Sequence, residues 1–87
     1  MAASNPDLTL SETWQDLTAT YAGMISVSSF VQCKGGYPCL IYWGGGSAPA
    51  GSAGAVLTSG NTAYGTAAKI WVRAVSGSAV IACGTTD

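Results

Sequence analysis

The sequence contains no histidine and few charged side chains of either sign. Charged residues make up 8% of the 87 positions and the formal net charge is −1, whereas ordinary soluble domains contain about 25% charged residues. With no histidine and four carboxylates, general acid–base catalysis has few groups to use. The three basic residues cannot form the clusters of Lys and Arg that bind nucleic acid. The composition therefore argues against an enzyme and against a nucleic-acid partner.

Membrane, metal and cofactor sites also lack their usual sequence signals. No segment approaches the roughly 20 apolar residues of a membrane span, and the N-terminus has neither the basic nor the apolar region of a signal peptide. We therefore expect a chain that folds in a cytoplasm without a membrane partner. Asp7, Glu12 and Asp16 match no compact loop of oxygen ligands. Residues 44–47 lack the Gly-Lys-Ser/Thr sequence of a phosphate loop, so we expect no metal and no cofactor.

The three cysteines carry the remaining reactive groups. Cys33 and Cys39 flank a five-residue turn, and opposite residues of an antiparallel pair have Cβ atoms about 4.5–5.5 Å apart. With slight adjustment such a pair can form a disulfide that staples a hairpin. Two buried thiols are the alternative, which is common in a reducing cytosol. Cys83 lies far away in sequence, and the three cysteines lack the paired spacing of a zinc site.

Short apolar segments with a period of two indicate an all-β protein. We expect strands at residues 24–33, 39–43, 55–58 and 62–64, an extended segment at 8–18, and a glycine-rich loop at 44–54. No segment shows a convincing helical period. The prediction is one small antiparallel β-sandwich or jelly-roll-like barrel of about six to eight short strands. This domain covers residues 11–87, and an extended N-terminal arm covers residues 1–10.

The segment 68–75 has the clearest alternation in the chain. Its predicted core-facing residues are Ala68, Ile70, Val72 and Ala74, and its outward residues are Lys69, Trp71, Arg73 and Val75. A Ser-Gly-Ser turn and a second apolar run ending at Cys83 follow, so the sequence predicts a β-hairpin. The preceding strand 39–43 is apolar on both faces, which predicts a central or covered strand with Trp43 in the core.

The low charge suggests that other subunits cover part of the surface. Hydrophobic residues make up 48% of the sequence, and a net charge near zero favours association. Trp71 lies between Lys69 and Arg73 on the outward face, and large aromatic and arginine side chains are typical of interfaces. We expect these three residues, together with Pro6 and Leu8 of the arm, to contact neighbouring subunits.

Several segments resemble small virion proteins of tailed bacteriophages. The similar pieces are Thr-Trp-Gln-Asp-Leu at 13–17, Tyr-Trp-Gly-Gly-Gly-Ser-Ala-Pro at 42–49, Leu57 with Gly60, and Gly-Thr-Ala-Ala-Lys-Ile-Trp-Val-Arg-Ala at 65–74. The resemblance covers roughly residues 11–80. Cys33 departs from it, because a polar residue is expected after Val31 and Gln32.

The resemblance implies a non-enzymatic structural protein of the virion, made in the cytoplasm of a bacterial host. The most direct expectation is a capsid decoration, or cement, protein that binds the outside of the head as a trimer or other symmetric oligomer. Its partners would be the major capsid protein and copies of itself. One alternative is a carbohydrate-binding fibre or adhesin module with Trp71 or Tyr64 as a stacking platform. Another is a structural component of the neck or tail.

Overall fold

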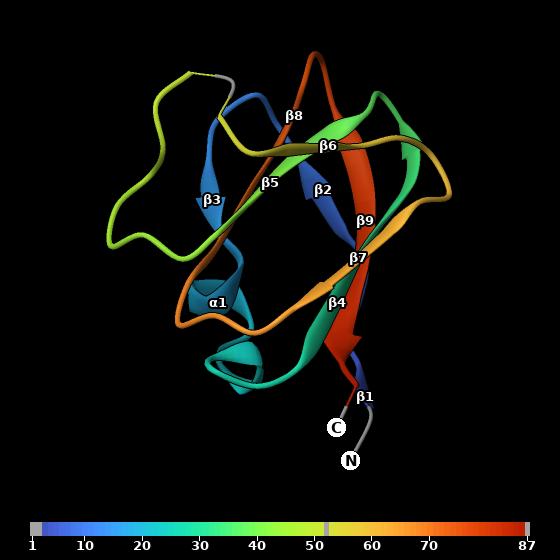
Figure 1. Cartoon of the computed structure of the whole chain (residues 1–87). Helices are drawn as coiled ribbons and strands as arrows, with labels where there is room; N and C mark the ends of the chain where they lie inside the picture. The colour runs from blue at the N-terminus through green and yellow to red at the C-terminus, as the bar shows by residue number, and fades with distance from the viewer. Residues whose placement is uncertain (1–2, 52, 87) are drawn as a thin grey trace.

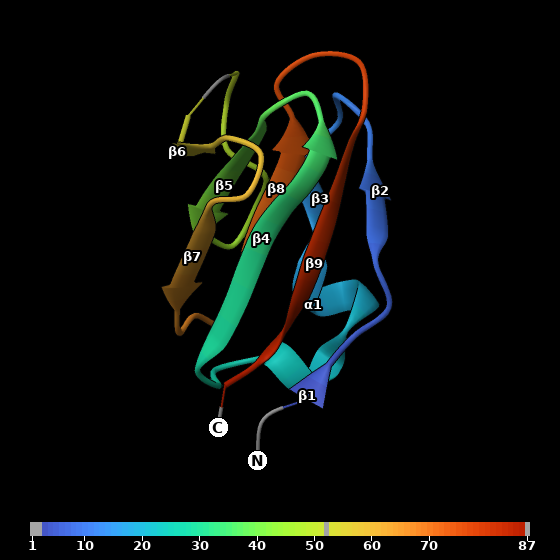
Figure 2. The same cartoon turned by 90° about the vertical axis from the view of Figure 1, so that its right-hand side faces the viewer.

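Two antiparallel sheets pack face to face in the computed structural model, which describes residues 3–51 and 53–86 (Figures 1 and 2). The five-stranded sheet contains β1 (Ala3–Ser4), β2 (Leu8–Leu10), β4 (Ser29–Gly36), β7 (Thr62–Gly65) and β9 (Ala79–Thr85). The four-stranded sheet contains β3 (Gln15–Asp16), β5 (Cys39–Trp43), β6 (Ala55–Leu57) and β8 (Ile70–Ala74). The predicted sandwich is confirmed, and the described strands do not close into a jelly-roll-like barrel.

Two short connections carry the chain from one sheet to the other. Residues 37–38 lead from β4 to β5, and residues 75–78 lead from β8 to β9 (Figure 2). The sequence predicts a hairpin at both places, and both predictions are wrong, because β4 pairs with β7 and β9 whereas β5 pairs with β6 and β8. The apolar alternation is the same in either arrangement, since it reports only which face of a strand is buried.

The core lies between the sheets and is formed by the inward side chains of each strand. Those of β8 and β9 are Ile70, Val72, Ala74, Ala79, Ile81 and Cys83, each no more than 1% exposed. Trp71 and Arg73 are half-buried on the other face of β8, which confirms the predicted facing of this strand. Ala68 is exposed rather than in the core, because β8 begins after it. Trp43 is half-buried and packs against the core.

A short helical segment follows β3, where the sequence predicts extended chain. Helix α1 covers Leu17–Thr20, and a 3-10 helix covers Ala22–Met24. Asp16 is the N-cap of α1, because its Oδ1 accepts a 3.0 Å hydrogen bond from the Thr18 backbone N–H. The expectation of no helix is wrong here. Four residues are too few to show a helical period in the sequence.

The strand predicted at 24–33 begins later, at Ser29. Ile25 is in step with Val31 and Cys33 in the sequence, yet its side chain is exposed whereas theirs are buried. The reason is a change of direction at Ser26, whose φ of 55° lies in the left-handed region. Its N–H donates a 2.8 Å hydrogen bond to the Ala67 carbonyl, which fixes this bend against the segment between β7 and β8.

The N-terminal segment predicted as an arm is extended and lies along β9 of its own chain. Ala3 and Ser4 pair with Thr85 and Gly84, and β2 pairs with the other end of β9. Leu10 is fully buried in the core. The first two residues of the predicted arm lie outside the described part of the chain. Residues 3–10 therefore add two short edge strands to the five-stranded sheet.

Candidate interaction surface

The outer face of β8 carries the predicted interface residues Trp71 and Arg73. This face belongs to the four-stranded sheet, where β8 lies between β3 and β5. The described part of the loop at 44–54 lies on the same outer side of the molecule (Figure 1). Leu40 also faces outward, directly opposite Arg73 in the register, yet it is only 2% exposed. The chain's own segments therefore cover this part of the sheet.

Three side chains hold the loop at 44–54 against the sheet. The Trp71 indole Nε1 donates a 3.2 Å hydrogen bond to the Gly45 carbonyl. The Gly51 carbonyl accepts two bonds, one from Trp14 Nε1 at 3.1 Å and one from Arg73 Nη1 at 3.2 Å. The Arg73 guanidinium carbon also lies 5.9 Å from the centre of the Trp14 ring, within cation–π range. Trp71 and Arg73 thus make contacts inside their own chain.

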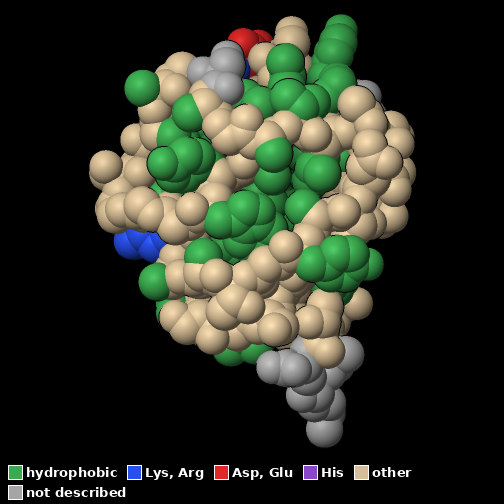
Figure 3. Space-filling view, viewed as in Figure 1, with side chains coloured by type: hydrophobic (Ala, Val, Ile, Leu, Met, Phe, Trp, Pro, Cys, Tyr) green, Lys and Arg blue, Asp and Glu red, His purple; other side chains and the backbone are tan. Residues whose placement is uncertain are grey.

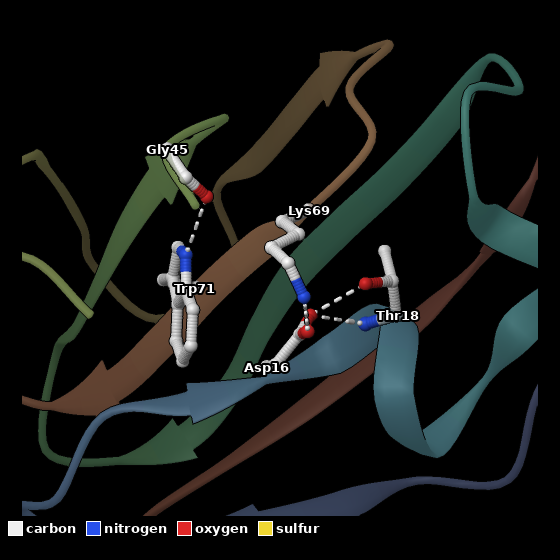
Figure 4. A network of polar contacts seen from close by, with 5 residues as sticks. All are labelled: Asp16, Thr18, Gly45, Lys69 and Trp71. Atoms are coloured by element: carbon white, nitrogen blue, oxygen red, sulfur yellow. Dashed lines mark hydrogen bonds and ion pairs between the residues drawn. The ribbon is translucent and has the colours of Figure 1, made fainter. Parts of the chain in front are cut away.

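Lys69 belongs to a polar network at the start of α1 (Figure 4). Its Nζ lies 3.0 Å from Asp16 Oδ2, and Asp16 Oδ1 accepts hydrogen bonds from the backbone N–H and hydroxyl of Thr18. Burial alone would raise the pKa of Asp16, but the bonds from Thr18 and Lys69 outweigh it, so the pKa falls below 3.8. Lys69 Nζ also lies 5.9 Å from the centre of the Trp71 ring. The network joins β3, α1 and β8.

Of the other predicted interface residues, Leu8 lies in β2 of the five-stranded sheet and Pro6 lies in the link between β1 and β2. Pro6 is exposed, and its carbonyl accepts a 2.9 Å hydrogen bond from the Tyr21 hydroxyl. Leu8 pairs with Ile81 and packs partly against the core. The structure therefore does not bring these two residues together with the β8 residues, because β2 and β8 belong to different sheets.

All three cysteines are free, fully buried thiols. Cys33 points inward from β4, and Cys39 is the first residue of β5. The two thiols therefore face each other from different sheets. Burial raises the pKa of Cys39 to about 12, and the nearby Cys33 thiol adds to the shift. Burial also raises the pKa of Cys83. A disulfide between Cys33 and Cys39 stays a prediction, and it would join the two sheets rather than staple a hairpin.

A second surface lies on the outer face of the five-stranded sheet, and of its residues the sequence singled out only Tyr64, as an alternative stacking platform for a sugar. A groove of about 510 Å³ lies there, over β4 and β7. Phe30 and Gln32 share the outward face of β4 and line the groove together with Thr62 and Tyr64 of β7. The alternation of Phe30 with Gln32 is visible in the sequence. The pairing of β4 with β7, which completes the groove, is not.

The described residues, 3–51 and 53–86, contain no group of three or more His, Cys, Asp or Glu side chains that could hold a metal ion. Within the same ranges no helix is long and apolar enough to cross a membrane. Comparisons with protein-family models, with curated proteins and with solved structures gave no match. The function therefore has to be argued from the surfaces of this chain.

Proposed function

We propose that the protein is a non-enzymatic structural protein of a virion, and that it decorates the outside of the head as a symmetric oligomer. Its mechanism is the formation of noncovalent contacts with copies of itself and with the major capsid protein. The similarity of residues 13–17, 42–49 and 65–74 to small phage virion proteins supports this setting. The arrangement of charge on the folded chain supports the mode of binding.

The observation that most supports the proposal is that every described charged side chain already forms an ion pair or a hydrogen bond within the chain. Of the seven charged residues, Asp87 lies outside the described part of the chain. The other six are engaged within the chain: Lys34 with Asp7 at 2.6 Å, Lys69 with Asp16 at 3.0 Å, Glu12 with the Gly77 N–H at 2.9 Å, and Arg73 with backbone carbonyls. Recognition by this surface therefore relies on apolar, aromatic and neutral polar groups, as in the core of an interface.

Exposed apolar side chains gather along one edge of the sandwich. Val56 on β6 is 57% exposed and Tyr64 on β7 is 71% exposed. Seen from this edge, hydrophobic side chains occupy the middle of the surface, and charged ones show only at its margins (Figure 3). Among the described residues β6 pairs only with β5, and β7 pairs only with β4. An unpaired strand edge with apolar side chains is a template for association with another chain.

The size of the chain makes such an interface significant for its stability. A standard interface buries about 800 Å² on each partner, which is about a fifth of the 4232 Å² that this chain exposes. Burial of apolar area contributes about 25 cal/mol per Å² before the cost of association is subtracted. Repetition of one contact over many symmetric sites on a capsid then adds avidity.

The proposal is tested with purified protein and with heads that lack it. We expect sedimentation equilibrium to give the mass of a closed oligomer, and we expect added protein to bind the head surface at regular sites in electron micrographs. A chain that remains monomeric at all concentrations and does not bind heads would contradict the proposal. If electron micrographs show density for the protein at the neck or tail instead of the head, the decoration role would be contradicted and the role as a neck or tail component supported.

A further inference from the structure

The groove on the five-stranded sheet adjoins the edge at which we propose association, because Tyr64 of β7 belongs to both. It lies on the outer face of the sheet that is turned toward the viewer in Figure 2, near the end where β1 meets β9. Six residues supply its relevant groups: Ser4, Phe30, Gln32, Thr62, Tyr64 and Thr86. Its volume of about 510 Å³ is within the range of small-molecule sites.

Strand register builds the groove from two rows of outward side chains. Phe30 lies opposite Tyr64, and Gln32 lies opposite Thr62, in the β4–β7 pair. On its other side Phe30 lies opposite Gly84 of β9. A Cβ at Gly84 would lie 3.0 Å from Phe30 Cε1 and would collide with the Ala3 carbonyl oxygen. The glycine therefore leaves room for the Phe30 ring and for the close approach of β1.

The polar groups of the groove are available to a ligand. The side-chain amide of Gln32 and the hydroxyls of Thr62 and Tyr64 have no hydrogen-bond partner among the described residues. Tyr64 is the most exposed large hydrophobic residue described in the chain, at 71%. Exposed polar groups beside an aromatic ring can bind a ligand that has both an apolar face and hydroxyl groups.

The groove is lined by uncharged residues, which makes some classes of ligand less suitable than others. The groove residues include no Lys, Arg, Asp or Glu, so neither an anion nor a cation meets an opposite charge there. A purely apolar ligand would bury the Gln32 amide without a partner, which is unfavourable. A pyranose ring offers a C–H face to an aromatic ring and hydroxyl groups to amides and alcohols, and it carries no charge.

We propose that this groove binds a neutral oligosaccharide. Tyr64 stacks on the C–H face of one sugar ring, and Gln32 and Thr62 exchange hydrogen bonds with its hydroxyls. The Phe30 ring forms the apolar floor beside Tyr64. This site lies on the sheet opposite to Trp71.

The first test is a titration of the ¹⁵N-labelled chain with four neutral trisaccharides: maltotriose, cellotriose, mannotriose and triacetylchitotriose. We expect at least one of them, at millimolar concentration, to shift the backbone amide signals of Phe30, Gln32 and Tyr64. Absence of shifts in these residues with all four sugars would overturn the proposal. Shifts confined to the Trp71 face would overturn it as well, because they would place the sugar on the other sheet.

Variants then assign the contacts for the sugar that binds. Tyr64→Ala should weaken binding by about tenfold or more, whereas Tyr64→Phe keeps the ring and should retain most of the affinity. Tyr42→Ala is the matched control, because Tyr42 is an exposed tyrosine on the other sheet. Gln32→Leu should also weaken binding, with an unchanged circular dichroism spectrum. Equal affinity of Tyr64→Ala and the unmodified chain would exclude this groove as the sugar site.

Discussion

The Trp71 indole Nε1 donates a hydrogen bond of 3.2 Å to the carbonyl of Gly45. The two residues are 26 positions apart in sequence, and the bond fastens the beginning of the glycine-rich loop to the first part of β8. A side chain that the sequence places on an outer face for contact with other subunits therefore also orders a loop of its own chain. A neighbouring subunit that contacts Trp71 would meet this loop as well.

Replacement of Trp71 by Phe should loosen the loop with little effect on the core. Phenylalanine keeps an aromatic ring on β8 but removes the donor to Gly45, and a hydrogen bond contributes about 1 kcal/mol. We expect faster hydrogen exchange of backbone amides near Gly45, measured by NMR. Trp14→Phe is the matched control, since it should affect the loop near Gly51 instead. Unchanged exchange near Gly45 in Trp71→Phe would show that the indole bond does not hold the loop.

Val72→Asp should prevent folding. Val72 is fully buried at the centre of β8, and an unpaired carboxylate there would cost several kcal/mol, which is a large part of the stability of a small domain. Val75→Asp, three positions later at an exposed site, should fold normally. Circular dichroism and urea unfolding distinguish the two variants. A folded Val72→Asp protein would mean that the facing of β8 is reversed.

Asp16→Asn should lower stability at neutral pH and not at acidic pH. Because the pKa of Asp16 in the folded chain lies below 3.8, its carboxylate stabilises the fold fully above that value. The contribution is lost as the pH falls below 3.8 and through the lower pKa of the folded state. The asparagine variant keeps an acceptor for Thr18 but loses the charge facing Lys69, so we expect a deficit of about 1 kcal/mol at neutral pH.

Urea unfolding at a series of pH values measures this effect as the difference between the two proteins. We expect the difference to shrink as the solution becomes more acidic than the ordinary pKa of an aspartate. Lys69→Met provides the complementary variant, because it removes the ion pair while Asp16 stays in place as the cap of α1. A difference that stays constant from neutral to acidic pH would show that the Asp16 charge is not the stabilising group.

Cys33 and Cys39 should react slowly with iodoacetamide in the folded chain. Both are fully buried, and a pKa of about 12 keeps Cys39 protonated at neutral pH, whereas alkylation requires the thiolate. Mass spectrometry should show labelling of both residues after unfolding in urea. The experiment includes a phosphine reductant, so that a disulfide is not mistaken for protection. Rapid labelling of the native, reduced protein would contradict the burial of this pair.

The strands and their buried faces were predictable because a period of two identifies them locally. Ile70, Val72 and Ala74 alternate with Trp71 and Arg73 in the sequence as they do in β8. The strand at 39–43 is apolar on both faces and lies between β8 and β6, with Leu40 covered on its outer side. Such patterns depend only on which side of a strand is buried.

The pairing of strands was not predictable in the same way, because it depends on contacts between distant segments. A short turn such as 75–78 permits a hairpin or a crossing to the opposite sheet, and both bury the same residues. The groove was missed for this reason, since Phe30 and Tyr64 become neighbours only when β4 pairs with β7. The loop contacts of Trp71 and Arg73 likewise require the fold of residues 44–54.

The most direct test of the structural role is the mass of the assembled protein with and without a charge at the β6 edge. Val56→Lys places a positive charge on the exposed edge strand, and Ser47→Lys adds the same charge at an exposed loop position as a control. In sedimentation equilibrium we expect an oligomer for the unmodified chain and for Ser47→Lys, and a monomer for folded Val56→Lys. A monomeric unmodified chain, or an oligomer that Val56→Lys leaves intact, would contradict assembly through this edge.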